Sequence, residues 1–348
     1  MRDVTDLSCF GWDGCDQGLL PAGTAPARVA RIDRGRLTVL TAEGELRVVP
    51  GTSLHASVLG APAVGDWVAL RGELAVAVLP RRSAFVRTVA GRTSTAQVVA
   101  ANLDVVLVVD ALTVDPRLRR VERYLAVAWN SGATPVVVLT KADLCDDVAA
   151  AVAAVREDAL GVDVLPVSSV TGAGVDAVRA LLGPGRTAAM VGPSGVGKSS
   201  LANALAGRPV AGTREIREDG RGRHTTTARE LHVLPGGGLL VDTPGMRELA
   251  LYDDADGVDT AYADVAELAA GCRFRDCGHR GEPGCAVAAA IAEGRLDPAR
   301  FTGWRKLQAE ARRQLLRVDA RARAEEHARL RTRFRAQREL PNRPRVGR

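Results

Sequence analysis

A glycine-rich segment near the middle of the chain has the residue types and spacing of a phosphate-binding loop. The segment is 192–199, with the sequence GPSGVGKS, and it lies between an apolar run at 187–191 and a helix-like stretch that begins at Ser200. Glycines at these positions let backbone N–H groups turn inward around phosphate oxygens, which a Cβ atom would obstruct. The pattern predicts a nucleotide site; the alternative is a simple glycine-rich turn before a helix.

The side chains that end this loop have direct roles in nucleoside triphosphate chemistry. Lys198 is placed to reach the β- and γ-phosphates as a point charge, and the Ser199 hydroxyl is placed to bind Mg²⁺. The following helix directs the positive end of its dipole at the anion. The predicted nucleotide contacts here are Gly192, Pro193, Ser194, Gly195, Val196, Gly197, Lys198, Ser199 and Ser200.

A second loop, earlier in the chain, has residues that would read the base. Thr140, Lys141, Ala142 and Asp143 follow an apolar strand pattern and match the guanine-reading motif Asn-Lys-x-Asp, with threonine in place of asparagine. The Asp143 carboxylate can accept hydrogen bonds from guanine N1–H and N2–H₂, a pairing that adenine cannot supply. Lys141 can lay its aliphatic stem on the base.

A third loop supports the same choice of base. Ser168 and Ser169 open the sequence SSVTG after the next predicted strand, and this sequence is similar to the Ser-Ala-x-x-Gly loop that backs the base in GTPases. Each short loop alone is weak evidence. Together with the phosphate-binding loop, the two loops predict GTP rather than ATP.

Two segments after the phosphate-binding loop have the features of nucleotide-sensing switches. The sequence GRHTTT at 222–227 contains Thr226, which is predicted to bind Mg²⁺ and to sense the γ-phosphate. The sequence DTPG follows the apolar run 239–241. Its Asp242 is predicted to bind Mg²⁺ through water, and the Gly245 N–H is predicted to face the γ-phosphate. Asp-Thr-Pro-Gly is also a common turn, and the preceding strand favours the functional interpretation.

The residue that orients the attacking water is not obvious from the sequence. Many GTPases use a Gln directly after the Asp-x-x-Gly motif, and here that residue is Met246, which has no strong donor or acceptor. His224 is the predicted replacement, because its imidazole can accept a proton or a hydrogen bond near neutral pH. The alternative is an exposed histidine that contacts RNA.

Strands alternate with helices around these loops. The continuous apolar run at 103–109 is typical of a strand that is buried on both faces of a parallel sheet. The expected elements that follow are a helix at 116–130, a strand at 136–139, a helix at 146–160, a strand at 162–167 and a helix at 174–182. This alternation predicts a doubly wound α/β P-loop GTPase domain at 103–255.

The order of the motifs predicts a circular permutation. The base-reading loops precede the phosphate-binding loop, whereas ordinary GTPases have them last. A doubly wound sheet tolerates this rearrangement because chain ends can lie close together, so joining them and opening another loop preserves the site.

Five short apolar alternations at 27–82 precede this domain. They predict a small barrel, and an OB-fold at 27–85 fits this length. OB-folds commonly bind oligonucleotides. The alternative is a barrel that only supports its neighbour, because this stretch has one Trp and no Tyr or Phe before residue 85. A connector is expected at 86–102, and the arm at 1–26 has no assigned function.

A cluster of soft ligands follows the GTPase domain. Cys272, Cys277, His279 and Cys285 form the Cys₃His set of a structural, closed zinc site. The alternative of three buried thiols and an unrelated histidine fits less well, because charged residues surround the cluster.

A basic helical segment ends the chain. A helix is expected at 303–340, and residues 305–348 carry a net charge of +10. Arginine-rich helices are often only solvated, but beside a zinc knuckle this charge favours RNA. An α-helical zinc-finger domain is therefore expected at 256–348.

Composition limits the remaining possibilities. A chain of 348 residues with 46% hydrophobic residues is long enough for two or three domains. It has no apolar run of 18 residues and no signal-peptide pattern at its start, so a cytoplasmic protein without a membrane partner is expected. The net charge is +6, so the part before residue 305 carries about −4.

The motifs TKAD, GPSGVGKSS, GRHTTT, DTPG and CRFRDCGHRGEPGC, in this order, resemble one family. The chain is similar to the circularly permuted ribosome-biogenesis GTPases, the ribosome small subunit-dependent GTPase A family. The resemblance covers nearly everything from the barrel to the tail. It implies weak GTP hydrolysis that the small ribosomal subunit stimulates, and a role late in the assembly of that subunit.

The expected partners are therefore the small subunit and its rRNA, with the protein as a monomer. Thr140 departs from the family's usual Asn, which could lower nucleotide affinity. The tail past Leu340 has no counterpart that can be aligned. Two other functional classes remain as alternatives: an ordinary P-loop ATPase, and a non-catalytic RNA-binding scaffold.

Overall fold

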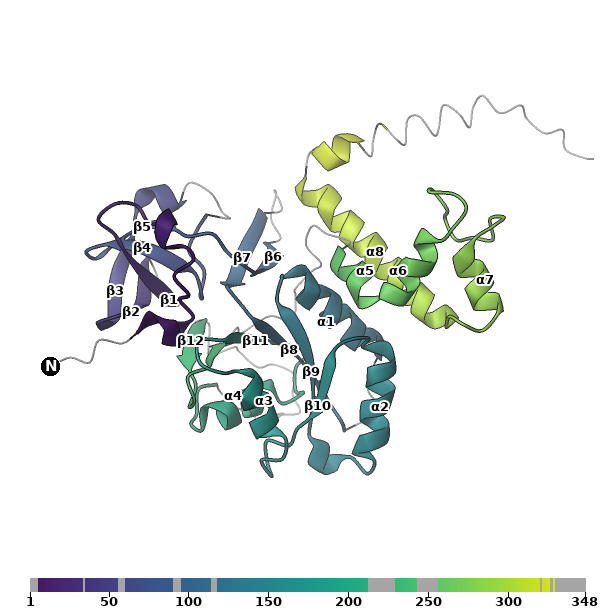
Figure 1. The fold of residues 1–348 in the computed structure, drawn as a ribbon, viewed down its shortest axis with the longest axis horizontal. Helices are drawn as coiled ribbons and strands as arrows, with labels where there is room; N and C mark the ends of the chain where they lie inside the picture. The colour runs from purple at the N-terminus through teal and green to yellow at the C-terminus, as the bar shows by residue number, and fades with distance from the viewer. Residues whose placement is uncertain are drawn as a thin grey trace, which may run out of the picture.

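The computed structural model shows three connected parts (Figure 1): a β-barrel, a central sheet flanked by helices, and a helical part beside α1. The structure describes residues 6–33, 35–55, 60–89, 95–113, 118–211, 229–242, 256–319, 321–325 and 328. Within these residues, no helix has both the length and the apolar character that crossing a bilayer requires.

The barrel has five strands and confirms the predicted OB-fold. Its strands pair in the order β1-β2-β3-β5-β4, and β4 pairs back with β1 to close the barrel. The β3–β5 pair is parallel, and the other pairs are antiparallel. Val29, Val39 and Val68 fill its interior and have no exposed surface. The strands are β1 (Ala25–Asp33), β2 (Arg36–Thr41), β3 (Gly44–Pro50), β4 (Trp67–Arg71) and β5 (Leu74–Val78).

The segment expected to be a connector contains two strands. β6 (Ala84–Val89) and β7 (Thr95–Ala101) form a separate antiparallel sheet. The sequence pattern missed them because polar residues interrupt the apolar ones, although Phe85 and Ala100 are buried.

The N-terminal arm also has structure where it is described. Two 3-10 helices, Leu7–Phe10 and Gln17–Leu19, precede the barrel. The Trp12 ring lies 4.7 Å from the Trp67 ring of the barrel, measured between centroids. Gly11 approaches the backbone of Gly185 so closely that a Cβ atom would lie 2.5 Å from its carbonyl oxygen. The arm therefore packs against both the barrel and the central domain.

The central sheet has the strand order β10-β9-β8-β11-β13-β12. All its pairs are parallel except β12–β13. The strands are β8 (Val105–Ala111), β9 (Thr134–Thr140), β10 (Asp163–Pro166), β11 (Thr187–Val191), β12 (Glu230–Val233) and β13 (Leu239–Asp242). The helices that join them are α1 (Leu118–Asn130), α2 (Val148–Asp158), α3 (Val175–Leu181) and α4 (Lys198–Ala206).

Helices cover both faces of this sheet, as the continuous apolar run of β8 predicts. Val106 and Val108 pack in one cluster with residues of α1 and α2. Val105 and Leu107 pack in another cluster with residues of α3 and α4. Successive strand residues point to opposite faces, so every residue of β8 is buried. The doubly wound fold is confirmed.

The chain order in this sheet is that of a permuted GTPase. β9 and β10, which carry the predicted base-reading loops, precede β11, which carries the phosphate-binding loop. At its other edge the sheet continues into the barrel, because β12 pairs with β1 through Arg31 and Glu230. The two domains therefore share one continuous 11-stranded ladder.

The helical part contains α5 (Asp256–Ala261), α6 (Ala263–Ala270), α7 (Ala286–Ala292) and α8 (Pro298–Val318). The prediction that the last helix begins at Gly303 and runs as one element to Leu340 is wrong. The helix begins at Pro298, because the Asp297 carboxylate caps it by accepting from Ala299 N–H and Pro298 suits the first turn. It ends at Val318, since Asp319 has extended backbone. Positions 329–340 lie outside the described residues.

Candidate functional site

The phosphate-binding loop leaves β11 and enters α4 with the backbone shape that its glycines require. Gly192, Gly195 and Gly197 have φ values of 146°, 79° and 94°. A Cβ atom on Gly192 would lie 2.2 Å from the carbonyl oxygen of Val109 on the neighbouring strand β8. Only glycine therefore fits at the start of the loop.

Lys198 and Ser199 lie in the first turn of α4, as the motif predicts. Lys198 Nζ donates to the carbonyl oxygens of Gly192 and Pro193 at 2.8 and 2.5 Å. The ammonium group thus lies across the mouth of the loop. Val196 is buried and Ser199 is half-buried, whereas Ser194, Gly195 and Ser200 are exposed. The N-terminus of α4 and the lysine together provide a concentrated positive site for phosphate.

Thr140 ties the base-reading loop to the phosphate-binding loop. It ends β9 and is buried, and its hydroxyl donates to the carbonyl oxygen of Val196. The carbonyl oxygen of Asp110 lies 3.1 Å from the same hydroxyl. The threonine that departs from the family pattern therefore bridges two loops within the site.

The polar residues in the rest of the base-reading loop differ in exposure, since Lys141 is half-buried and Asp143 is exposed. Lys141 has a left-handed backbone with φ 58°, and a single 3-10 turn at Ala142–Leu144 follows it. Ala142 N–H donates to the carbonyl oxygen of Val167 at 3.1 Å, which joins this loop to the segment after β10. Asp143 is exposed, so its carboxylate is available to a base.

The loop after β10 is closed by its first serine. Ser168 is buried, and its Oγ accepts from the N–H groups of Val170 and Thr171 at 3.3 and 3.1 Å. Ser169 is half-buried beside it. Gly174 begins α3 with φ 75°, and a Cβ atom there would lie 2.2 Å from the carbonyl oxygen of Pro166. The loop is therefore held in one shape beside the base-reading loop.

Asp242 ends β13 at the same edge of the sheet. It pairs in register with Glu230 of β12. The pKa of Asp242 is raised, mainly by burial. Glu230 raises it further, whereas His232 and Lys198 have the opposite effect. Burial also lowers the pKa of His232. The Asp242 carboxylate therefore interacts with both acidic and basic groups, and a cation bound beside Lys198 would favour its ionised form.

Several predicted site residues lie outside the described part of the chain. These are His224, Thr226, Gly245 and Met246. The remaining predicted nucleotide contacts come from β9, β10, β11 and β13 and their loops, and the carboxyl ends of these strands meet at one edge of the sheet.

The predicted metal ligands also come together. The ligand atoms of Cys272, Cys277, His279 and Cys285 all lie within 4.8 Å of one another. His279 Nδ1 lies 3.5 Å from Cys272 Sγ and 3.6 Å from Cys285 Sγ. Four tetrahedral ligands at the usual Zn–S distance lie about 3.8 Å apart. Burial lowers the pKa of His279 and so favours the neutral imidazole that a metal requires. The four residues could hold a metal ion.

Comparisons with known proteins agree with this geometry. The family model described as RsgA GTPase matches residues 78–252. The small ribosomal subunit biogenesis GTPase RsgA of Streptomyces coelicolor is 47% identical over 92% of this chain and 90% of its own length. The protein of the same name from Opitutus terrae is 44% identical over 90% of this chain and 92% of its own length. The chain belongs to the RsgA GTPase family.

Two solved structures have the same fold. YjeQ from Thermotoga maritima aligns with a TM-score of 0.61 and 25% identity, covering 83% of this chain and 98% of its own. YloQ, a circularly permuted GTPase, aligns with a TM-score of 0.60 and 22% identity over 84% of this chain and 96% of its own.

An ion pair beside the phosphate-binding loop was missed by the sequence analysis. Asp110 is the next-to-last residue of β8 and is buried. Arg120 of α1 donates to both of its carboxylate oxygens, at 2.7 and 2.9 Å. The only signal in the sequence is an acidic residue directly after a buried apolar strand. The pair fixes the end of β8, whose Asp110 carbonyl lies beside Thr140.

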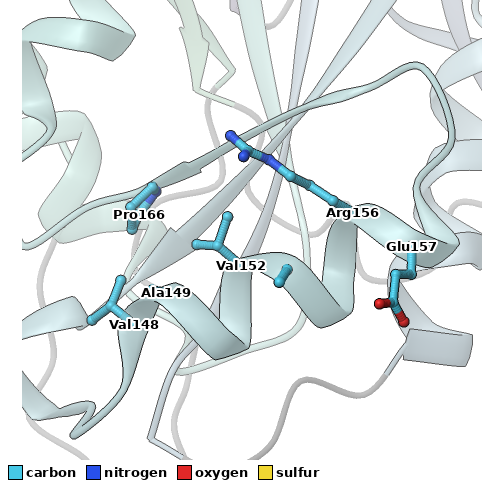
Figure 2. Close-up of a pocket in the computed structure, with 7 residues that line it drawn as sticks. Val148, Ala149, Val152, Arg156, Glu157 and Pro166 are labelled. Atoms are coloured by element: carbon cyan, nitrogen blue, oxygen red, sulfur yellow. The ribbon is translucent and has the colours of Figure 1, made fainter.

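A separate hollow of about 720 Å³ lies along α2 at the outer edge strand of the sheet. Figure 2 shows Val148, Val152 and Arg156 on α2 and Pro166 on β10. Its lining includes none of the predicted nucleotide-binding residues. This hollow is therefore not the nucleotide site.

Proposed function

We propose that this chain binds and hydrolyses GTP at the carboxyl edge of its central sheet and acts in the maturation of the small ribosomal subunit. The observation that carries the proposal is the convergence of three loops. The loops after β9 and β10 and the loop before α4 are joined by the Thr140 hydroxyl and by the Ala142 N–H. The loops after β9 and β10 are placed to bind the base of a nucleotide, and the loop before α4 is placed to bind its phosphates.

The base-reading role is assigned to Thr140, Lys141, Ala142 and Asp143, with Ser168 and Ser169 behind the base. The exposed Asp143 carboxylate supplies two acceptors, which complement the N1–H and N2–H₂ of guanine. Because adenine cannot supply these two donors, the presence of Asp143 argues against an ordinary ATPase.

The phosphate role is assigned to residues 192–200. Lys198, once it leaves the carbonyl oxygens of Gly192 and Pro193, neutralises charge on the γ-phosphate as it is transferred to water. Ser199 and Asp242, with Thr226, would hold Mg²⁺, which supplies further charge neutralisation. Gly245 N–H would face the γ-phosphate.

The water-orienting role is assigned to His224, because Met246 cannot perform it. A polar group of the ribosome is the alternative source. A histidine that orients or deprotonates the water should affect turnover far more than GTP affinity.

The metal is proposed to be one structural zinc ion. Three thiolates and an imidazole are soft and borderline ligands that suit zinc, and four ligands leave no open position for catalysis. A short loop of this kind gains its stability from the ion.

The partner is proposed to be the small ribosomal subunit and its rRNA. The printed names of the relatives refer to biogenesis of that subunit. The basic segment after α8 supports contact with rRNA, because residues 329–348 carry eight arginines and one glutamate. A monomer that acts in the cytoplasm, where subunits are assembled, is the accompanying expectation.

Asp143→Asn tests the assignment of the base. The variant replaces an acceptor with a donor opposite guanine N1–H, so GTP affinity should fall by about tenfold or more and xanthosine triphosphate affinity should rise. An unchanged preference for GTP would remove the base-reading role.

Turnover with ribosomal subunits tests the rest of the proposal. GTP hydrolysis is measured alone, with purified small subunits and with large subunits, and Lys198→Ala serves as the inactive control. We expect small subunits alone to accelerate hydrolysis. Binding to small subunits without any turnover would instead favour the RNA-binding scaffold.

A further inference from the structure

The metal-binding loop presents an exposed aromatic ring. Phe274 lies between the ligands Cys272 and Cys277, and its side chain is 46% exposed. Among the large exposed hydrophobic side chains in the described part of the chain, it is the only aromatic one. An exposed ring of this size gains free energy by contact with a partner.

Phe274 lies between two arginines in the sequence, and one of them contacts its ring. The Arg273 guanidinium lies 5.5 Å from the ring centroid, and Arg275 is exposed on its other side in the sequence. Two acidic side chains lie in the same loop: Asp276 is exposed next to Arg275, and Glu282 accepts from the N–H groups of Gly278 and Arg280 at 3.0 and 2.5 Å, so the three arginines of the loop outnumber its acidic residues by one. The surface around the ring therefore combines a π-face with positive charge.

Backbone hydrogen bonds, rather than contacts of the ring, fix the position of Phe274 in the loop. Cys277 N–H donates to the carbonyl oxygen of Phe274 at 3.2 Å, and Arg273 N–H donates to the carbonyl oxygen of Gly284 at 3.0 Å. A Cβ atom on Gly284 would lie 2.9 Å from Arg273 Cβ, so the two ends of the loop are in close contact. Because these hydrogen bonds constrain the loop backbone, docking through Phe274 costs less conformational entropy than docking through an unconstrained loop.

More positive charge lies on the helix that packs beside the loop. Arg305 of α8 is exposed, and its guanidinium lies 5.7 Å from the centroid of Phe301, a ring that itself contacts His279. Lys306 is exposed next to it. Figure 1 shows α7 and α8 at the opposite end of the molecule from the barrel.

We propose that Phe274, with Arg273 and Arg275, is a stacking site for an unpaired base of RNA. Bases that are not in a helix stack on aromatic rings, and arginines beside them bind the phosphates. A guanidinium over one face of the ring leaves the other face for a base. The proposal rests on the proposed binding to the small ribosomal subunit and gives that binding a specific contact in the helical part.

The test measures the affinity of the full, metal-loaded chain for purified small subunits in the presence of a GTP analogue. Phe274→Ala should raise the Kd about tenfold, the effect expected for loss of one stacked base. Phe274→Tyr should restore the affinity, whereas Phe274→Leu should not, because leucine has apolar area but no π-face. Leu160→Ala is the matched control, since Leu160 is 47% exposed in the central domain.

Salt dependence separates the ring from its arginines. Phe274→Ala should lower log K equally at every salt concentration, because stacking releases no counterions. Arg275→Ala should reduce the slope of log K against log salt by about 0.7, the value for one phosphate contact on single-stranded nucleic acid. Metal content is measured for each variant, and one equivalent should remain, since no ligand is changed.

Three results would overturn the inference. The first is unchanged affinity of Phe274→Ala, and the second is rescue by leucine as good as by tyrosine, which would indicate an apolar contact with protein. The third is a photo-crosslinking amino acid at position 274 that attaches to a ribosomal protein rather than to rRNA. If the unaltered chain did not bind small subunits at all, the proposed function itself would fail.

Discussion

A buried arginine lies at each junction between the central domain and its two neighbours. One arginine donates to neutral oxygens, and the other donates to carboxylates. At the barrel junction, Arg28 of β1 has no exposed surface. It donates to the carbonyl oxygens of Phe10 and Asn102 at 2.7 and 3.0 Å and to the Thr187 hydroxyl at 3.0 Å. All these acceptors are neutral. Its Nε–H has no partner among the described residues.

At the junction with the helical part, Arg300 of α8 lies in a carboxylate network. Arg300 is 5% exposed and donates to Glu122 of α1 at 2.8 Å and to both oxygens of Asp264 at 2.7 and 2.8 Å. The Tyr262 hydroxyl and Arg119 also donate to Glu122, at 2.8 and 2.6 Å. Here every charge has a partner of opposite sign.

The difference predicts unequal consequences when the arginine is lost. Removing Arg28 leaves neutral oxygens without donors, which costs about 1–3 kcal/mol. Removing Arg300 leaves the buried Glu122 carboxylate with less positive charge beside it, which costs about 3–5 kcal/mol. The barrel is also held by the β1–β12 ladder, whereas the helical part depends on side chains.

Arg300→Met and Arg28→Met test this comparison directly, and the first should have the largest effect. Both replace the cation with an apolar side chain of similar length. We expect Arg300→Met to lower the free energy of unfolding by about 3–5 kcal/mol and to raise amide exchange in α1, α5 and α8. Arg28→Met should cost about 1–3 kcal/mol, with faster exchange in β1 and β11.

The exposed Arg36 of β2 supplies the control. Arg36→Met should change stability by less than about 0.5 kcal/mol. Equal losses for Arg28→Met and Arg300→Met would show that the charge of the acceptors does not distinguish the junctions.

Loss of metal binding should weaken only the junction between the central domain and the helical part, and by less than the loss of Arg300 does. His279 packs against α8, with its ring centroid 6.0 Å from that of Phe301 and 5.9 Å from that of Trp304. Arg300 directly precedes Phe301 on this helix. Cys277→Ser should therefore abolish metal binding, increase exchange at 272–285 and α8, and leave GTP affinity nearly unchanged. Retention of one equivalent of metal would contradict the Cys₃His site.

The sequence was sufficient to predict the features that short segments encode. The phosphate-binding loop, the predicted base-reading loops and the Cys₃His set each lie within 14 or fewer consecutive residues, and the structure has the loops at the ends of the strands that the sequence predicts and the four ligand atoms within 4.8 Å of one another. The apolar run of β8 likewise predicted a strand buried on both faces, because each of its residues needs an apolar environment.

The sequence could not predict the features that distant residues create. Arg28 and Thr187 are 159 positions apart, and Arg300 and Glu122 are 178 apart. Among 44 arginines, nothing local marks these two as buried. Their burial follows from how the domains pack, which no periodicity records. Strands β6 and β7 were missed for a different reason, since polar residues interrupt their apolar pattern.

The smallest expected effect is a difference in pH dependence between the two junctions. Burial is the largest influence on Glu122 and raises its pKa above the ordinary value, against the opposing effects of Tyr262 and Arg119. A carboxyl group whose pKa is higher in the folded state takes up a proton on folding. Its contribution to stability is therefore complete below about pH 4.5 and declines as the pH rises through the raised value. Burial lowers the pKa of Arg28 only to about 10, so that residue is charged in both states across the same range.

We therefore expect the urea midpoint of the helical part to fall gradually as the pH is raised above 4.5, with metal saturating so that the cysteine ligands do not titrate. Glu122→Gln keeps an acceptor for Arg300 but cannot ionise, so it should flatten this profile. Arg28→Met should leave the slope of the helical part unchanged, because Arg28 lies at the other junction, where its loss instead raises the pKa of the buried Asp66. A slope that survives in Glu122→Gln would assign the pH dependence to another group, and a slope that disappears in Arg28→Met would mean that the two junctions do not respond to pH independently.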